Sequence, residues 1–152
     1  MRKLNILIVE DGRSQREMLR DFLISEGHRV REAENGEAAI KTVLDSSFDL
    51  ILLDYKMPGM DGMDVLKEVK RINHEIDVVI ITAYGTIETA VEAIKVGAID
   101  YITKPVELEE LLLLVDRVAE RRGLIRENEL LRQELGKRGV TADKIIYESE
   151  KM

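Results

Sequence analysis

A set of chemically capable side chains stands at the ends of the most apolar segments of this sequence: Glu10, Asp11, Asp54, Thr82 and Lys104. Three carboxylates that gather in one place repel one another, so their convergence would call for a compensating cation. Oxygen-only ligands, with room for water and a phosphate, favour Mg²⁺. The sequence therefore predicts a magnesium site formed by Glu10, Asp11 and Asp54.

Asp54 directly follows a run of apolar residues, so we expect it at a fixed point at the end of a strand. A carboxylate held beside a metal ion is a candidate nucleophile for phosphoryl transfer, which would produce an aspartyl phosphate. The Lys104 ammonium could pair with one phosphoryl oxygen, and the Thr82 hydroxyl could donate to another. A cis bond between Lys104 and Pro105 could aim the lysine back across the sheet edge.

The same residues have plainer structural interpretations. Glu10 and Asp11 could simply cap the first helix near its positive N-terminus. Lys104 could be a surface lysine in front of a helix-starting proline. The addition of Asp54 to the acidic pair favours the metal site.

Short apolar segments alternate with segments of helical period, and these elements must position the site. Strands are expected over residues 4–9, 28–33, 48–53, 78–81 and 99–103, and helices over residues 15–25, 36–44, 63–72 and 86–96. Such an alternation predicts right-handed crossovers and one parallel sheet between two layers of helices. In a sheet of this kind the functional site lies beyond the carboxyl ends of the strands.

The composition excludes several other classes of protein. The 152 residues hold 23 Lys and Arg against 30 Asp and Glu, a net charge of −7, which argues against nucleic-acid binding by phosphate neutralisation. Cysteine is absent, which removes disulfides, thiolate metal sites and a cysteine nucleophile. No run approaches the roughly 18 apolar residues of a membrane span. We therefore expect a cytoplasmic protein without membrane contact.

The motifs that contain the candidate site residues resemble, in their order and spacing, those of the receiver domain of two-component response regulators. The resemblance rests on Glu10-Asp11, on the block from Asp54 to Gly62, on Thr82-Ala83 and on the segment from Tyr101 to Pro105. It implies a doubly wound, flavodoxin-like or CheY-like sheet of five parallel strands in the order 2-1-3-4-5. Residues 82–95 also resemble the corresponding region of NtrC-type activators, which work with sigma-54 polymerase.

The resemblance also implies a role for each site residue. Asp54 would be the phosphoacceptor, and Mg²⁺ would be bound by Asp11 and Asp54 directly, by Glu10 through water and by the Lys56 backbone carbonyl. Lys104 would contact the phosphoryl group. Thr82 and Tyr101 would form the switch pair, although Tyr101 could also be an ordinary strand residue half-buried against a helix. The family more commonly has Asp where this sequence has Glu10.

The helical pattern that begins at Glu107 continues beyond the expected end of such a domain. Its first part offers a face of Leu108, Leu111, Leu112, Val115, Val118 and Ala119 to the sheet. Further on, a two-stranded coiled-coil seam is predicted by the spacing of Leu124, Asn128, Leu131 and Leu135. Residues 117–138 carry a net charge of +3, which also marks a separate segment. A solvated linker is the alternative, because short helices are marginal in water.

We therefore expect a receiver domain at residues 1–120, a coiled-coil linker helix at 121–138 and the start of a truncated AAA+ ATPase-like domain at 139–152. ATP binding is not expected here, because no G-x-x-x-x-G-K-[ST] loop is present. A naturally short regulator is the alternative.

The predicted function is that of a phosphoacceptor domain rather than an enzyme, with only Mg²⁺-dependent self-phosphorylation and self-dephosphorylation. A sensor histidine kinase would phosphorylate Asp54. Phosphorylation would change the arrangement of a homodimer formed by the fifth helix and the linker, and this change would control a downstream ATPase and transcription. One alternative is an aspartyl-phosphate phosphatase, but that class usually has a second acid where this chain has Lys56. Another is a flavin or nucleotide binder, but the loop at Glu10-Asp11-Gly12 presents carboxylates where phosphate would bind.

Overall fold

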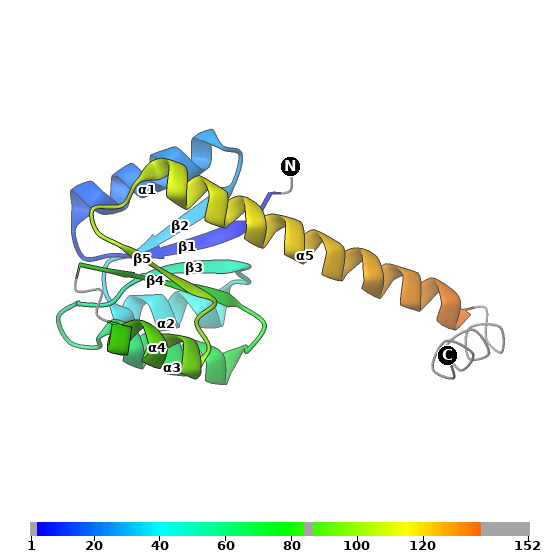
Figure 1. Cartoon of the computed structure of the whole chain (residues 1–152). Helices are drawn as coiled ribbons and strands as arrows, with labels where there is room; N and C mark the ends of the chain where they lie inside the picture. The colour runs from blue at the N-terminus through cyan, green and yellow to red at the C-terminus, as the bar shows by residue number, and fades with distance from the viewer. Residues whose placement is uncertain (1–2, 84–86, 138–152) are drawn as a thin grey trace.

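The computed structural model describes residues 3–83 and 87–137, with side chains as far as residue 134. Its strands are β1 (Asn5–Val9), β2 (Arg29–Ala33), β3 (Leu50–Asp54), β4 (Asp77–Thr82) and β5 (Asp100–Thr103), and its helices are α1 (Arg13–Ser25), α2 (Gly36–Asp45), α3 (Gly62–Ile72), α4 (Ile87–Val96) and α5 (Leu108–Lys137). All strand pairs are parallel, and the order is β2-β1-β3-β4-β5 (Figure 1). The predicted fold class is confirmed.

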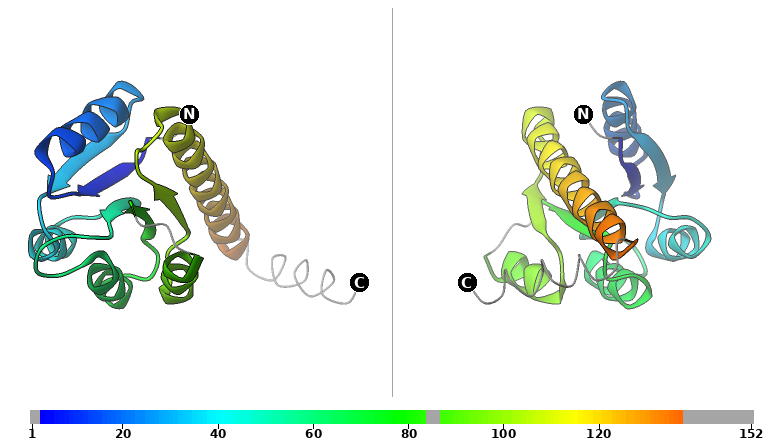
Figure 2. Two further views of the ribbon diagram at one scale, coloured as in Figure 1. Left: turned by 60° about the vertical axis from the view of Figure 1, so that its left-hand side comes forward. Right: turned by 90° about the vertical axis from the view of Figure 1, so that its right-hand side faces the viewer.

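Helices cover both faces of the sheet, with α1 and α5 on one side and α2, α3 and α4 on the other (Figure 2). Alternate residues of the central strands face the two helix layers, because successive side chains of a strand point to opposite faces. Leu7 and Ile51 pack with α2 and α3, while Ile6 and Leu52 pack with α1 and α5. This double burial explains why the central strands are apolar except at their end residues.

The turn after β3 depends on Gly62, the first residue of α3. A Cβ atom at this position would lie 2.6 Å from the Cα of Tyr55 and 2.7 Å from the Asp54 carbonyl oxygen. The Gly62 amide also donates to the Tyr55 carbonyl at 2.7 Å. Asp61 caps the helix, because its Oδ1 accepts from the Asp64 amide at 2.9 Å. Together these contacts draw the start of α3 tightly against the end of β3 and fix Asp54.

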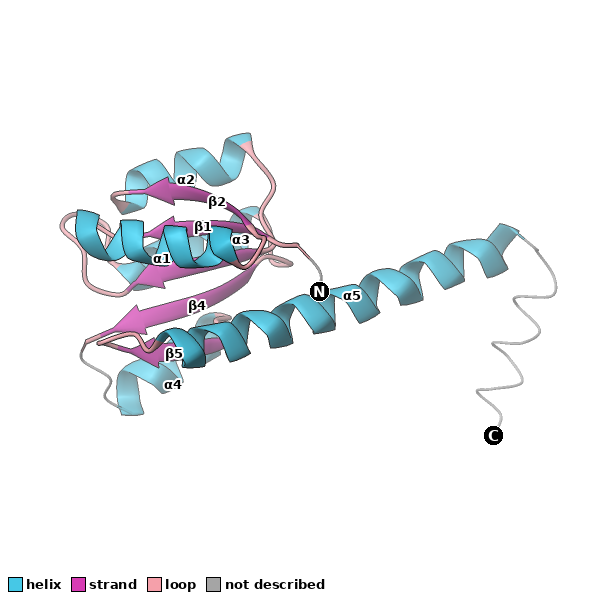
Figure 3. Cartoon of the chain, turned by 90° about the horizontal axis from the view of Figure 1, so that it is seen from above, coloured by secondary structure: helices cyan, strands magenta, loops and turns pink. Residues whose placement is uncertain are grey.

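Helix α5 extends well past the sheet (Figures 1 and 3). Its sheet-facing residues differ in part from the predicted set: Leu114 is buried, whereas Leu108 is exposed, Leu112 is only half-buried, and the other four predicted residues are buried as expected. The helix runs unbroken through Gly123, across the predicted boundary at residue 120, and through Gly136. Residues 139–152, predicted to begin a further domain, lie outside the described residues.

Candidate functional site

The chemically capable residues converge at the carboxyl edge of the sheet. Asp54 and Thr82 are the last residues of β3 and β4, while Glu10 and Lys104 directly follow β1 and β5. Asp11 continues from Glu10 into the loop before α1.

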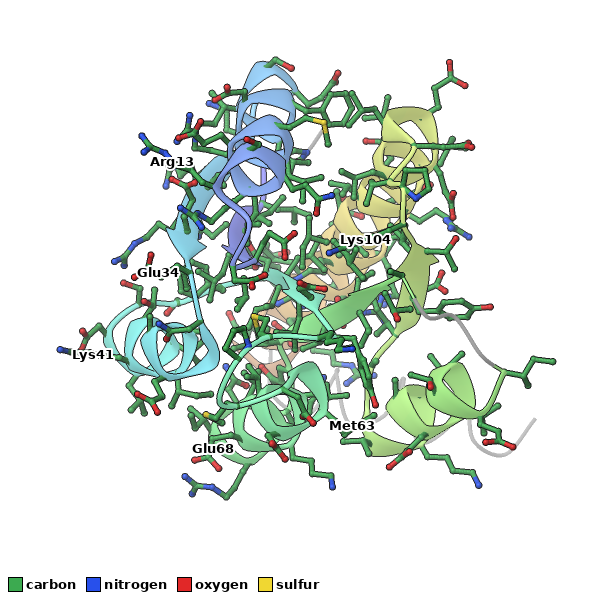
Figure 4. The ribbon with its side chains drawn as sticks, turned by 90° about the vertical axis from the view of Figure 1, so that its left-hand side faces the viewer. Arg13, Glu34, Lys41, Met63, Glu68 and Lys104 are labelled. Carbon is green, nitrogen blue, oxygen red and sulfur yellow. The ribbon has the colours of Figure 1, made fainter. Side chains whose placement is uncertain are left out.

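Figure 4 looks onto this edge of the domain. Lys104 lies near the middle of the view, while Arg13, Lys41 and Glu68 lie towards its rim. The long side chain of Lys104 is therefore placed among the strand ends rather than at the periphery, which disfavours its interpretation as an ordinary surface lysine.

The three acidic residues form one cluster. Glu10, Asp11 and Asp54 each offer a carboxylate oxygen, and these oxygens lie within 4.8 Å of one another. Glu10 and Asp54 are buried, while Asp11 is exposed. Oε2 of Glu10 is buried without a hydrogen-bond partner. A buried, unpaired carboxylate oxygen beside two further carboxylates fits a hard divalent cation such as Mg²⁺.

Lys104 contacts two of these acids directly. Its Nζ lies 3.2 Å from Oε1 of Glu10 and 3.2 Å from Oδ1 of Asp54. The Lys104–Pro105 peptide bond is cis. Burial lowers the pKa of Lys104, but the charges of Asp54 and Glu10 outweigh that effect, and the net pKa is raised. A full positive charge is thus held beside Asp54, where it can pair with an anionic group bound there.

The crowding that favours the charged form of Lys104 disfavours the charged form of Glu10. Burial and the adjacent Asp54 carboxylate raise the pKa of Glu10 to about 7, although Lys104 acts to lower it. One lysine therefore does not compensate both buried acids, and a proton or another cation is needed near neutral pH.

Thr82 and Tyr101, the predicted switch pair, lie on neighbouring strands. Thr82 is buried, whereas Tyr101 is 39% exposed. Tyr101 is in register with Ile80 and Thr103 with Thr82, so Tyr101 is a diagonal neighbour of Thr82. Ile80 packs in the α2, α3 and α4 layer, so both members of the pair belong to that face of the sheet.

The remaining predicted residues lie in the loop after β3 and on α5. Lys56 is in that loop, two residues beyond Asp54. Leu124, Asn128 and Leu131 are exposed along α5, and the side chain of Leu135 lies outside the described side chains.

A cavity of about 280 Å³ opens beside the acidic cluster and was not predicted from the sequence. Glu10, Asp54 and Lys104 line one part of it, and Met18 and Val106 are among its apolar residues. Met18 lies on α1 and is 43% exposed, and nothing in the spacing of apolar residues on that helix signals a cavity.

Comparison with known proteins identifies the class. The family model described as the response regulator receiver domain matches residues 6–116. The transcriptional regulatory protein ZraR of Klebsiella oxytoca is 44% identical over 111 residues, 73% of this chain and 25% of that protein. The regulatory protein AtoC of Escherichia coli (strain K12) is 39% identical over 130 residues, 86% of this chain and 28% of that protein.

Solved structures agree with these relatives. A crystal structure of NtrX from Brucella abortus matches with a TM-score of 0.78 at 37% identity, over 86% of this chain and 30% of that one. The receiver domain of the same protein matches with a TM-score of 0.72 at 38% identity, over 76% of this chain and 98% of that one.

The chain therefore belongs to the response regulator receiver domains. It resembles receiver regions of ZraR, AtoC and NtrX, and it spans only 25% and 28% of the length of the ZraR and AtoC relatives compared above. The match leaves the phosphatase alternative without support. No helix among residues 3–83 and 87–137 is long and apolar enough to cross a membrane.

Proposed function

We propose that this chain is the receiver and linker portion of an NtrC-type activator, and that Asp54 accepts a phosphoryl group from a sensor histidine kinase. The observation that carries the proposal is the position of Asp54. Its buried carboxylate stands at the end of β3, 3.2 Å from the Lys104 ammonium and beside Glu10 and Asp11.

Mg²⁺ is the expected cofactor, held by carboxylate oxygens of Asp11 and Asp54, by Glu10 through water, and by the Lys56 backbone carbonyl. The ion supplies positive charge that offsets the charge of the transferring phosphoryl group. The unpartnered Oε2 of Glu10 supports this assignment, because a buried carboxylate oxygen requires a partner.

In the proposed transfer, an Asp54 carboxylate oxygen attacks the phosphorus of the donor. A new O–P bond forms as the bond between phosphorus and the kinase histidine nitrogen breaks, and the electron pair leaves with that nitrogen. The Lys104 ammonium pairs with a phosphoryl oxygen, and the Thr82 hydroxyl donates to another. Water later attacks the phosphorus of the aspartyl phosphate, the O–P bond to Asp54 breaks, and inorganic phosphate leaves while the Asp54 carboxylate is restored. Self-phosphorylation and self-dephosphorylation are the only chemistry we assign.

The switch follows from the hydrogen bond that Thr82 gains. When its hydroxyl moves towards the phosphoryl group, space is vacated behind the end of β4 on the face that Thr82 shares with Tyr101. The exposed Tyr101 ring can then turn inward, which changes the surface formed by α4, β5 and α5. Two positions of one side chain thereby couple a local charge to a distant surface.

The dimer is assigned to α5 and its extension, as a parallel two-stranded coiled coil. Leu124 and Leu131 are exposed apolar residues, with side chains 58% and 57% exposed, and Asn128 lies between them on the same stripe. An asparagine inside such a seam favours two strands and fixes their register. Leu135 would continue the seam.

In a longer parent protein, residues 1–120 would be the receiver, residues 121–138 the linker, and residues 139–152 the start of an AAA+ domain. Phosphorylation would alter the dimer and so control ATPase assembly and sigma-54-dependent transcription. We expect this function in the cytoplasm, because a transcription activator acts where DNA and polymerase are. The net charge of −7 supports a role without nucleic-acid contact by this segment.

The test is phosphorylation by a small acyl phosphate with Mg²⁺, followed by peptide mass mapping. One base-labile phosphate on Asp54, absent from Asp54→Ala and strongly reduced without Mg²⁺, is expected. Modification at another residue, or persistence in Asp54→Ala, would overturn the assignment. Glu17→Gln is the matched control, because Glu17 is an acid of α1 that pairs with Arg13 and is not a member of the acidic cluster.

A further inference from the structure

We propose that Asp77 is a positioning residue that sets the direction of the linker helix, residues 121–137 of α5, by holding Arg121 and Arg122 against the amino end of the sheet. The control of the helix direction by Asp77 does not depend on the proposed function. Its consequence for the dimer deepens the proposed function and rests on it.

Asp77 forms ion pairs with both Arg121 and Arg122. It is the first residue of β4, and only 5% of it is exposed. Its Oδ1 lies 2.5 Å from Nη2 of Arg121, and its Oδ2 accepts from Nη1 of Arg122 at 3.1 Å. Each carboxylate oxygen therefore has its own guanidinium partner, and charge-assisted bonds of this kind fix geometry as well as distance.

Arg122 makes further bonds to the same end of the sheet. Its Nε donates to Oδ1 of Asp49 at 3.3 Å, and its Nη1 donates to the Glu75 carbonyl at 3.0 Å. The other oxygen of Asp49 accepts from the amide of Asn5 at 2.8 Å. Arg122 is thus tied to the segments that lead into β3 and β4, and through Asp49 to the start of β1. We call Asp49, Asp77, Arg121 and Arg122 the arginine clamp.

The clamp lies where the apolar packing of α5 ends. Val118 and Ala119 are the last residues of α5 in the hydrophobic core. Gly123 directly follows the clamp, and glycine has the lowest helix propensity of any residue except proline. Beyond its core residues, α5 extends past the sheet (Figure 3).

The next turns of the helix line a cavity. Ile125, Arg126 and Glu129 line a cavity of about 430 Å³ together with His74 and Glu75. Close packing therefore does not hold these turns against the domain, and the polar bonds of the clamp remain to define the angle at which the helix departs.

A third cation increases the dependence on Asp77. Lys70 donates to the carbonyls of His74 and Ile76 beside the clamp. Burial lowers the pKa of Lys70, the charge of Asp77 raises it, and the charges of Arg121 and Arg122 lower it. Asp77 pairs with both arginines, so its removal leaves Asp49 as the one acid of the clamp and increases the repulsion among the three positive groups.

The consequence concerns the seam of Leu124, Asn128 and Leu131. These residues begin one turn or less beyond the clamp, so the angle set at Arg121 and Arg122 determines where the seam points relative to the receiver. A change in the receiver surface can alter the dimer only when the linker helix is held firmly to the receiver.

Spin-label distance measurements test the direction directly. The sequence has no cysteine, so Lys67→Cys on α3 and Glu127→Cys on α5 give two specific sites. The labelled chain is measured in the presence of excess unlabelled chain, so that a dimer contributes one labelled copy. We expect one narrow distance distribution, at least twofold broader after Asp77→Asn and unchanged after the control Glu17→Gln, which removes the exposed Arg13–Glu17 pair.

A second variant, with measurements of helix content and of the folded population, separates a change of direction from a loss of structure. Arg121→Gln with Arg122→Gln must broaden the distribution as well, at unchanged helical circular dichroism and with the folded state fully populated. Unchanged distributions in the folded variants would overturn the proposal, and so would broadening accompanied by loss of helix, because direction would then not be what the clamp controls. Acyl-phosphate labelling of Asp54 in the same variants tests the proposed function separately, and we expect it to be retained.

Discussion

Replacing Glu10 by glutamine should stabilise the domain at pH 8 when no divalent cation is present, and should change it little at pH 5. Burial and the neighbouring Asp54 raise the pKa of Glu10 from 4.5 to about 7. A folded-state pKa above the unfolded value contributes stability below about pH 4.5 and loses it as the pH rises through 7. The substituted glutamine side chain would keep an acceptor for Lys104 and add an amide donor towards Asp54, without the charge.

The size of the effect follows from the shift. The difference between a Glu10 pKa of 4.5 in the unfolded chain and about 7 in the folded domain corresponds to about 3 kcal/mol of unfolding free energy at pH 8, and to less than about 1 kcal/mol at pH 5. We therefore expect wild type to lose about 2 to 3 kcal/mol relative to Glu10→Gln over this interval. Titration of the groups that do not interact with Glu10 is common to both proteins and cancels in the comparison.

Urea unfolding in EDTA at pH 5 and pH 8 measures both proteins, with Glu17→Gln as the control for loss of an exposed acid. Addition of Mg²⁺ at pH 8 should then stabilise wild type more than Glu10→Gln, because a ligand that binds only the folded state adds stability. Equal destabilisation of Glu10→Gln at both pH values in EDTA would refute the prediction that the buried charge of Glu10 destabilises the domain at pH 8.

Three further substitutions test the scaffold. Gly62→Ala should destabilise the domain by about 1 to 3 kcal/mol in urea unfolding, because the new Cβ would overlap the backbone at Tyr55; a neutral effect would contradict the tight turn. The Leu4 amide donates to Nδ1 of His28, and burial lowers the pKa of His28, so its contribution to stability is lost as the pH falls below about 6.5. His28→Asn should flatten that acid-side slope, and an identical slope would refute the buried, neutral imidazole. Gly123→Ala should raise helical circular dichroism and stability by about 1 kcal/mol, whereas a loss of helix would show that α5 does not run through this residue.

The sheet could be predicted from the sequence because burial leaves a direct pattern. The central strands are covered on both faces and are therefore apolar except at their end residues, whereas β2, with its alternating Val30 and charged neighbours, is an edge strand. The sheet-facing side of α5 was only partly predicted. Leucines are so dense from Leu108 to Leu114 that more than one helical face is apolar, and packing against the sheet buries Leu114 and leaves Leu108 exposed.

The convergence at the strand ends was also predictable, since parallel strands bring their carboxyl ends to one edge. The contact between Lys104 and Glu10 was not predictable. Their strands, β5 and β1, are separated in the sheet by β3 and β4, and the residues are 94 positions apart in the sequence. The contact depends on the length of both side chains, which spacing along the chain does not reveal.

The arginine clamp was missed for a related reason. From the sequence, Arg121 and Arg122 are two of the charges of the positively charged segment 117–138, whereas the structure pairs them with a buried acid at the start of β4. Asp77 precedes an apolar strand and has no local partner, and only the packing of α5 across the sheet brings the two arginines to it.

The central claim is that the acids at the strand ends share one divalent cation, and titration calorimetry with Mg²⁺ measures it most directly. At pH 7 we predict uptake at a single site, with release of a fraction of a proton because Glu10 is then partly protonated, and loss of uptake in Asp54→Asn. No uptake by wild type, or uptake that Asp54→Asn and Asp11→Asn leave unchanged, would contradict the account.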